Sequence, residues 1–503
     1  MKKAIQRGMI ALSAAGTLGL CAEKGNAASK PNVIVILADD LGYGDLSCYG
    51  ATKISTPNID RLATEGNKFI NAYAPVSICS PSRYGLLAGR YVWRSSRHPL
   101  TGVMAVGAPL VFETNRLTLA TLFKNRDYTT ACIGKWHLGF GEGDNPRLFY
   151  DWNQDEIKPG PLEVGFDYFF GLVGNTANEP RVYIENHRFV GRKPGDQVSV
   201  VLGGTQIKPF VKEVKPWSPD AEFKNDQVAT DLTKKVVEFI ERSKDKPFFI
   251  YFTPTIAHNP ITPSAAFIGT SGCGLYGDFV QELDSNVGTI VAALKKAGVL
   301  ENTLILFTSD NGGIAIDKNS SEFMIKNYPA NYQAAEAGHK ICGDLRGKKH
   351  SIYEGGLRVP FIVRWPGQIP AGTESGAVLC LTDVFATFAA ILGEDIPENA
   401  GEDSFNALPV WRGLTGASVR DNATLYSAIG NYAIRQGNWK LIQQGELEGK
   451  NKFHGENKNQ LYNLADDPAE TVNLWSSHPE VVKELSGLLE KIKTNGRSRP
   501  VGN

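Results

Sequence analysis

Residues 32–45 read NVIVILADDLGYGD, and this stretch decides the fold. Asn32 to Leu37 is an almost continuous run of β-branched and apolar residues, which is typical of a strand buried on both faces. The run ends on Asp39 and Asp40, and a glycine-containing turn follows. The stretch therefore predicts an internal strand of an α/β sheet with two carboxylates at its carboxyl end.

Similar runs recur along the chain and are separated by helical patterns. Strands are predicted at 129–134, 247–254, 304–308 and 361–364, and helices at 59–66 and 278–298. This alternation predicts a large, mostly parallel mixed sheet sandwiched by helices. Polar residues follow four of these strands: Asp39-Asp40, Lys135-Trp136-His137, His258 and Asp310-Asn311. Active sites of open α/β sheets lie at the carboxyl ends of strands, so these residues are the first functional signal.

The pattern of predicted secondary structure changes after about residue 405. Short strands are predicted at 424–434, 439–443 and 461–462, with a closing amphipathic helix at 481–492. We therefore expect a catalytic domain over 28–405 and a smaller C-terminal α+β subdomain over 406–503. Residues 141–167, 191–215 and 312–346 are expected to be long loops, where substrate selection usually resides.

The first 27 residues have the pattern of a signal peptide. Lys2, Lys3 and Arg7 precede an apolar stretch over 8–22 that is too short to span a bilayer, and small residues follow. We expect export to the periplasm or cell surface. A lipid anchor on Cys21 is a weaker interpretation, because the bulky Leu20 precedes it. No later segment has the length and apolarity of a transmembrane helix.

The net charge and the cysteine content limit the classes of protein to which this chain could belong. Lys+Arg and Asp+Glu both number 53, so the formal net charge is zero, which argues against a dedicated nucleic-acid binder. Six of the seven cysteines lie beyond the signal peptide and show no zinc-type spacing. They could form three disulfides in an oxidising compartment, but a chemical role for Cys79 would leave five, and no pairing can be deduced.

Residues 79–83 read CSPSR, and Gly89-Arg90 follow. Pro81 suits the first turn of a helix, which would place Cys79 at a helix N-terminus. A thiol there could be a nucleophile of lowered pKa, or the cysteine could simply be a buried structural residue. The whole string resembles the signature of the type I sulfatases of the alkaline phosphatase superfamily. The resemblance extends from Pro31 to about Asn473 and includes exported bacterial carbohydrate sulfatases.

This resemblance implies an unusual nucleophile. Cys79 would be oxidised to formylglycine by a dedicated maturation enzyme. The hydrated aldehyde would attack sulfur through one hydroxyl, giving a formylglycine-sulfate intermediate, and the second hydroxyl would later help to expel sulfate. The reaction would hydrolyse a sulfate monoester.

Asp39, Asp40, Asp310 and Asn311 offer hard oxygen ligands of the kind that Ca²⁺ takes. The absence of a histidine cluster makes zinc a poorer choice, whereas Mg²⁺ stays open. The four residues match the calcium site of the resembled family, in which residue 79 completes the shell.

The resemblance also suggests roles for the remaining polar residues. Arg83, Lys135 and Lys349 would form a cationic pocket around sulfate, with the adjacent Lys348 as the alternative to Lys349. His137 would contact the second hydroxyl of residue 79. His258 would be the general acid to the leaving alcohol, since its ordinary pKa lies near neutral pH.

Export and family together favour a sulfated oligosaccharide as substrate, from a glycosaminoglycan or mucin-type glycan. A galactose or N-acetylgalactosamine sulfate is preferred, and His98, Arg181 and Asn186 are candidate sugar-binding residues. Two alternatives stay open. One is a phosphomonoester or phosphonate hydrolase of the same superfamily, and the other is a glycan-binding pseudoenzyme.

Overall fold

The structure is a computed structural model that describes residues 30–97, 103–105, 107–113, 115–143, 150–205, 208–414, 419–444 and 459–500. Residues from Pro31 onward form one compact unit. The predicted signal peptide, with Cys21, lies outside the described residues, as does His98. The boundary expected between 405 and 406 stays a prediction.

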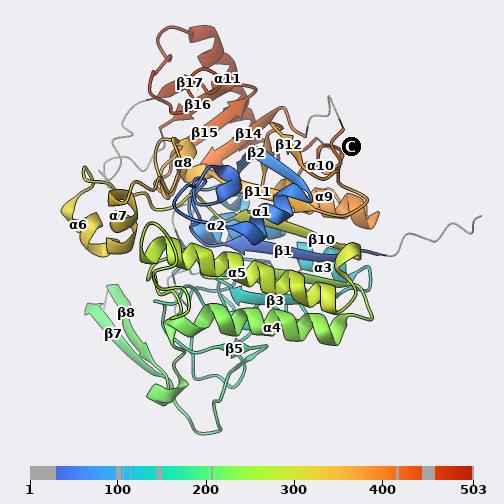
Figure 1. Ribbon diagram of the computed structural model, residues 1–503, viewed down its shortest axis with the longest axis vertical. Coiled ribbons are helices and arrows are strands. Elements are labelled where there is room, and N and C mark those ends of the chain that lie inside the picture. Colours follow the sequence, from blue (N-terminus) through green and yellow to red (C-terminus); the bar gives the residue numbers. More distant parts are fainter. Residues whose placement is uncertain are drawn as a thin grey trace, which may run out of the picture. The chain divides into compact units, whose positions relative to one another are not determined.

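A large mixed sheet occupies the centre of this unit (Figure 1). Within the described residues its strand order is β12-β2-β11-β10-β1-β9-β3-β4-β5-β6, with β13 beside β2. The strands of this sheet are β1 (Asn32–Ala38), β2 (Asn67–Tyr73), β3 (Thr129–Lys135), β4 (Tyr168–Leu172), β5 (Ile184–Glu185), β6 (Arg188–Phe189), β9 (Phe248–Thr253), β10 (Thr303–Ser309), β11 (Arg358–Arg364), β12 (Thr373–Ser375) and β13 (Leu379–Cys380). The central strands β10, β1, β9, β3 and β4 are parallel, whereas β11 is antiparallel to both neighbours. The predicted mostly parallel α/β sheet is confirmed.

Helices cover both faces of the sheet, as the uninterrupted apolar strands require. Val33, Val35 and Leu37 of β1 belong to one core, and Ile34 and Ile36 belong to the other. The first core includes helices α2 (Cys79–Ala88), α3 (Leu119–Lys124) and α9 (Asp383–Leu392), and the second includes α1 (Pro57–Thr64), α4 (Val228–Ser243) and α5 (Leu275–Lys296). Figure 1 shows α4 and α5 lying side by side across one face.

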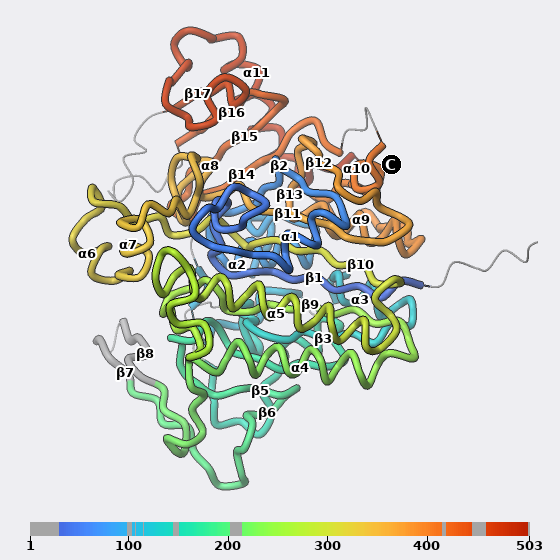
Figure 2. The backbone as a smooth tube through the Cα atoms, in the orientation of Figure 1, coloured from blue at the N-terminus to red at the C-terminus, as the bar shows by residue number. Residues whose placement is uncertain are grey.

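A second, antiparallel sheet is built by the C-terminal residues (Figure 2). Its strands are β14 (Asn422–Tyr426), β15 (Tyr432–Gln436), β16 (Trp439–Gln443) and β17 (Gln460–Asn463), and the closing helix is α11 (Pro479–Thr494). The prediction of one strand over 424–434 is wrong, because the chain reverses at Ser427–Asn431. There the Ser427 N–H donates to the Asn431 carbonyl at 2.9 Å, and Gly430 supplies a left-handed turn conformation.

Two of the expected loops contain regular structure. Residues 191–215 include the hairpin β7 (Ser199–Thr205) and β8 (Lys208–Lys215), and residues 312–346 include α6 (Glu322–Asn327) and α7 (Pro329–Glu336). The short helices α8 (Glu354–Leu357) and α10 (Leu408–Trp411) lie further along the chain. No helix among the described residues has the length and apolarity needed to cross a membrane.

Candidate active site

The polar residues predicted at the strand ends do converge. β1, β9, β3 and β10 are neighbours, so Asp39, Lys135, His258 and Asp310 meet at one edge of the sheet. Helix α2 begins there at Cys79. Ligand atoms of Asp39, Asp40, Cys79 and His258 all lie within 4.8 Å of one another.

The backbone around the site is held in unusual conformations. Asp40 and His137 have φ angles of 58° and 55°, in the left-handed region that non-glycine residues rarely adopt. The Asp39 N–H donates to the Ile256 carbonyl at 2.8 Å, and the Asp40 N–H donates to Asp310 Oδ1 at 3.2 Å. Such conformations cluster at functional sites, where the surrounding structure over-determines them.

Three carboxylates face three cations inside the site. Lys135 Nζ lies 2.9 Å from both carboxylate oxygens of Asp39. Arg83 Nη2 lies 2.7 Å from Asp310 Oδ2, and Arg83 Nη1 donates to the Lys135 carbonyl. Lys349 Nζ lies 2.7 Å from Asp40 Oδ2 and is buried, whereas Lys348 is only partly buried and makes no such contact among the described residues. Lys349 is thus the lysine that reaches the site.

Burial and charge act against each other on these carboxyl groups. Burial alone would raise the pKa of Asp39, but Lys135, His258 and Arg83 hold that pKa far below its usual value. Burial raises the pKa of Asp310 to about 6, although Arg83 opposes the shift. The site therefore concentrates negative charge on Asp39 and makes the charge on Asp310 costly, a cost that a further cation would remove.

His137 is buried and His258 is partly buried, and the pKa of each lies below its ordinary value, which favours the uncharged form at neutral pH. Burial lowers the pKa of His258 to about 4, and Lys349 adds to the effect. Its Nδ1 lies 2.6 Å from the Asn259 carbonyl, and its Nε2 lies 3.5 Å from Asp40 Oδ2. Burial likewise lowers the pKa of His137, whose Nδ1 is buried without a hydrogen-bond partner in the described part of the chain.

Cys79 itself lies at the N-terminus of α2 and is buried. Burial raises the pKa of the thiol, a direction that favours a buried cysteine over a thiol of lowered pKa. Desolvation outweighs Lys135 and Lys349, which pull in the opposite direction. The six cysteines of the described residues are all free, so no disulfide joins them.

The oxygen donors fit a hard divalent cation. Asn311 Nδ2 donates to Asp40 Oδ1 at 2.8 Å, and Asn311 Oδ1 is buried with no hydrogen-bond partner among the described residues. An unpartnered buried acceptor is costly unless it meets a donor or a cation. Asp39, Asp40, Asp310 and Asn311 could together supply the carboxylate and amide oxygens that Ca²⁺ prefers.

The speculative sugar-binding residues are engaged elsewhere in local contacts. Arg181 Nη2 donates to Asn225 Oδ1 at 3.0 Å, and its Nε lies 3.7 Å from Glu222. Asn186 occupies the turn between β5 and β6 with φ of 54°, and its Oδ1 accepts from the Phe169 N–H. Their role in binding sugar stays a prediction.

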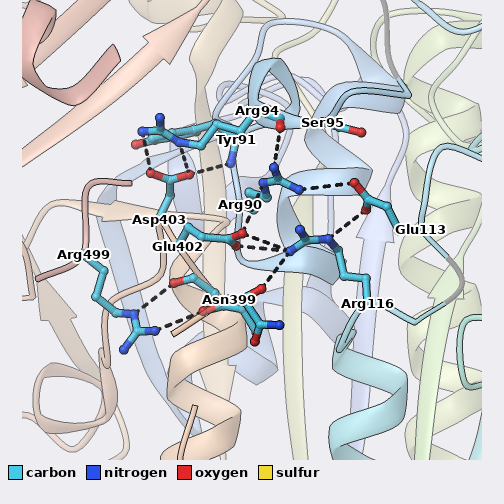
Figure 3. A network of polar contacts seen from close by, with 12 residues as sticks. Arg90, Tyr91, Arg94, Ser95, Glu113, Arg116, Asn399, Glu402, Asp403 and Arg499 are labelled. Carbon is cyan, nitrogen blue, oxygen red and sulfur yellow. Dashed lines mark hydrogen bonds and ion pairs between the residues drawn. The ribbon is translucent and has the colours of Figure 1, made fainter. Parts of the chain in front are cut away.

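The Gly-Arg pair of the sequence motif lies at the far end of α2 (Figure 3). Gly89 ends the helix in a left-handed conformation, and Arg90 contacts Glu113 at 3.6 Å and Glu402 at 3.4 Å. Arg94 pairs with Asp403 at 2.8 Å in the same network. The network ties the end of α2 to residues far along the chain, and the opposite end of that helix carries Cys79.

Sequence reasoning missed a cavity of about 550 Å³ beside Lys349. Asn259, Phe323 and His350 are among its lining residues. Their only signal in the sequence is position, because Asn259 follows His258 and His350 follows Lys349. Phe323 comes from α6, inside a segment expected to be a loop.

Comparison with known proteins shows which family shares this fold and this set of residues. Residues 31–394 match the family described as Sulfatase, and residues 347–495 match the family described as N-sulphoglucosamine sulphohydrolase, C-terminal. The chain is 37% identical over 505 residues to an N-acetylgalactosamine-6-O-sulfatase of Bacteroides thetaiotaomicron, a match that covers 94% of this chain and 95% of the relative. It is 32% identical to human arylsulfatase A, with 92% and 87% covered.

A solved structure agrees with these matches. That structure is described in connection with the metabolism of multiple glycosaminoglycans by Bacteroides thetaiotaomicron. It superposes on this chain with a TM-score of 0.82 at 35% identity. The superposition covers 93% of this chain and 100% of the other. The fold and the site thus define an α/β enzyme with a buried polar site at the carboxyl ends of its parallel strands. The chain belongs to the sulfatase family and is a sulfuric ester hydrolase.

Proposed function

We propose that this enzyme removes the 6-O-sulfate of N-acetylgalactosamine units in a sulfated glycan. The observation that carries the reaction is the convergence of Cys79, three carboxylates and two lysines in one buried site. The sugar is suggested by the relative of 37% identity, an N-acetylgalactosamine-6-O-sulfatase, which matches almost the whole chain. The signal-like N-terminus supports action on glycans outside the cytoplasm.

Two groups beyond the unmodified side chains complete the proposed chemistry. Residue 79, oxidised to formylglycine by a maturation enzyme, supplies a hydroxyl nucleophile in its hydrated form. Ca²⁺ held by Asp39, Asp40, Asp310 and Asn311 supplies charge neutralisation and favours deprotonation of that hydroxyl.

The chain's own residues bind and orient the sulfate group. Lys135 and Lys349 each hold a carboxylate in the structure, at 2.9 Å and 2.7 Å. In the proposed reaction, the two ammonium groups would donate to the sulfate oxygens, and the carboxylates that they contact in the structure would help to hold a divalent cation. Arg83 pairs with Asp310 and donates to the Lys135 carbonyl, and it is proposed to hold these two residues in place.

Charge balance supports a sulfate ester as the substrate. Asp39, Asp40 and Asp310 balance Arg83, Lys135 and Lys349, so a bound divalent cation leaves the site with net positive charge. An anionic ester entering the site restores the balance. The same anion would raise the proton affinity of His258, which then holds a proton for the leaving alcohol oxygen.

His137 is proposed to orient residue 79. Its buried Nδ1 has no partner among the described residues and is suited to bind a hydroxyl of the hydrated aldehyde. Its Nε2 lies 3.3 Å from the Met104 carbonyl, a contact that helps to hold the ring in place.

The test is sulfate release from a panel of defined sugars carrying sulfate at the 2-, 3-, 4- or 6-position. Mass spectrometry must first show an aldehyde at residue 79. Release from 6-sulfated N-acetylgalactosamine, well ahead of the other sugars, is expected. Release from another regioisomer would overturn the sugar assignment, and no release from any sugar would overturn the function.

A matched pair of aryl sulfate and aryl phosphate distinguishes the phosphomonoesterase alternative. Faster hydrolysis of the sulfate is expected. Binding of sulfated sugars without any turnover, after the aldehyde is confirmed, would favour a glycan-binding pseudoenzyme.

A further inference from the structure

We infer that the cavity beside Lys349 binds the sugar ring of the substrate, and that His350 and Phe323 determine which sulfated sugar is accepted. This inference rests on the proposed function and assigns the recognition of the leaving group to two residues of this chain. The cavity has a volume of about 550 Å³, within the range of small-molecule sites.

Three of the residues that line the cavity are reacting groups or their direct neighbours in the sequence. Ile78, which directly precedes Cys79, lines it, and so does Asn259, which directly follows His258. Lys349 lines the cavity and contacts Asp40. A sulfate group held by Lys349 would therefore leave its sugar ring in this cavity, next to the histidine that protonates the leaving oxygen.

His350 is the first proposed specificity residue. A side chain is kept at this position although its backbone conformation favours glycine. Its φ angle is 80°, and its N–H donates to the Ser77 carbonyl at 2.8 Å, which holds the residue in place beside α2. Glycine adopts this conformation without penalty, whereas a side chain is disfavoured. Asp40 and His137 share this feature in the proposed active site, whereas Asp127, Asn186 and Glu470 share it elsewhere, so the strain of His350 counts here only together with its place in the cavity. An imidazole at such a position can both donate to and accept from sugar hydroxyls.

Phe323 is the second specificity residue, because it offers an apolar face to the same cavity. It is 64% exposed, the largest fraction among the exposed large hydrophobic side chains of the described residues, and Val103 at 49% lines the same cavity. Exposed apolar side chains that gather at one cavity mark a binding surface. A sugar ring has an apolar C–H face and a polar rim, so Phe323 would pack against the face while His350 and Asn259 bind the rim.

Two substitutions test this assignment, each with a readout that a merely structural role would not move. His350→Gly removes the imidazole and relieves the backbone, so the midpoint of thermal unfolding should stay the same or rise. Its preference for N-acetylgalactosamine-6-sulfate over N-acetylglucosamine-6-sulfate should fall by about tenfold. Phe323→Ala should raise KM for both sugars by about tenfold and leave kcat nearly unchanged.

Two inhibitors separate the sugar site from the sulfate site. Inorganic sulfate should inhibit both variants as it inhibits the parent enzyme, whereas desulfated N-acetylgalactosamine should inhibit both more weakly. Asp127→Gly is the matched control, since it removes a side chain at φ of 61° at the opposite end of β3 and should change neither kinetic constant. Unchanged KM and sugar preference in both variants would overturn the inference, while the parent's sulfate release would leave the proposed function standing. A parent enzyme that releases no sulfate from any sugar would instead overturn the proposed function.

Discussion

Two of the buried charge clusters in the described part of the chain differ in whether they leave polar atoms without a partner. The catalytic cluster consists of Asp39, Asp40, Arg83, Lys135, Asp310 and Lys349, and the C-terminal cluster consists of Glu354, Arg358, Arg435, Lys440 and Glu470. In the C-terminal cluster, Lys440 Nζ lies 2.9 Å from Glu354 and 2.8 Å from Glu470. Tyr73 and Arg358 bind the second oxygen of Glu354.

The difference is one of unused bonding capacity. In the C-terminal cluster, Glu470 Oε1 makes no hydrogen bond of good geometry among the described residues, but it lies 2.8 Å from Lys440 Nζ, so Glu354 and Glu470 both contact this cation. The cluster connects α8 to β16, which joins the C-terminal sheet to the segment that follows Lys349. The catalytic cluster has buried atoms beside it, Asn311 Oδ1 and His137 Nδ1, with no hydrogen-bond partner in the described residues. Under the proposed function, similar burial and similar charges would serve stability in the C-terminal cluster and ligand binding in the other.

The largest effect is expected from Cys79→Ala. Removing the nucleophile should reduce kcat by about 10⁴-fold or more, because the remaining residues can bind sulfate but have no group to attack it. The midpoint of thermal unfolding should change little. Cys48→Ala, at a partly buried cysteine outside the site, is the control and should keep full turnover. Turnover by the Cys79→Ala protein at the parent rate would contradict the mechanism.

Removal of divalent metal is expected to abolish activity, and Ca²⁺ should restore it. Ca²⁺ should also raise the midpoint of thermal unfolding of the parent, since a ligand that binds only the folded state stabilises it. Asn311→Ala should weaken this calcium response by at least about tenfold in apparent affinity. Asn67→Ala is the matched control, because Asn67 is also buried with an unpartnered Oδ1 and lies at the far end of its strand. Full activity in a demonstrably metal-free preparation would exclude the calcium site.

The same substitution in the two clusters should have opposite readouts. Lys135→Met should lower kcat/KM by about 10²- to 10³-fold, while calcium compensates the charge on Asp39 and preserves stability. Lys440→Met leaves Glu354 and Glu470 buried without their shared cation, which should cost about 3–5 kcal/mol of stability. Thermal unfolding and activity per folded molecule measure both effects. Lys440→Arg keeps the charge and guards against a variant that does not fold. Equal losses of activity in both Met variants would erase the distinction between the clusters.

The sequence predicts features that depend on local patterns better than features that depend on contacts between distant segments. The run at 32–37 predicts β1 because strands buried on both faces require continuous apolar residues, whatever packs on them. The sequence predicts one strand where the structure has the hairpin at 422–436, because the turn residues, Ser427 to Asn431, include only one glycine and are flanked by apolar residues. The helices of 322–336 are short and partly exposed, so no apolar periodicity predicts them.

The same limit applies to the site. Residues at strand ends could be grouped from the sequence, because parallel strands bring their carboxyl ends to one edge. The raised pKa of the Cys79 thiol could not be predicted, since it depends on burial by distant segments. His350 and Phe323 escaped notice for a similar reason. The strain of one and the exposure of the other exist only in the folded chain.

The smallest expected effect concerns pH and the C-terminal cluster. Burial raises the pKa of Glu470 from 4.5 to about 7, although Lys440 opposes the shift. Because the folded state holds this proton more tightly than the unfolded state, the stabilisation is complete below pH 4.5 and is lost as the pH rises through about 7. Between those values the loss is up to about 1.4 kcal/mol per pH unit.

Glu470→Gln removes this titration and keeps the shape of the side chain. Its stability should therefore fall less steeply than that of the parent between pH 4.5 and 7, measured as the midpoint of thermal unfolding at a series of pH values. Glu490→Gln, on the exposed face of α11, should leave the profile of the parent unchanged. Identical slopes for the parent and Glu470→Gln would mean that Lys440 keeps Glu470 charged between pH 4.5 and 7. The ion pairs of the C-terminal cluster would then persist over that whole range.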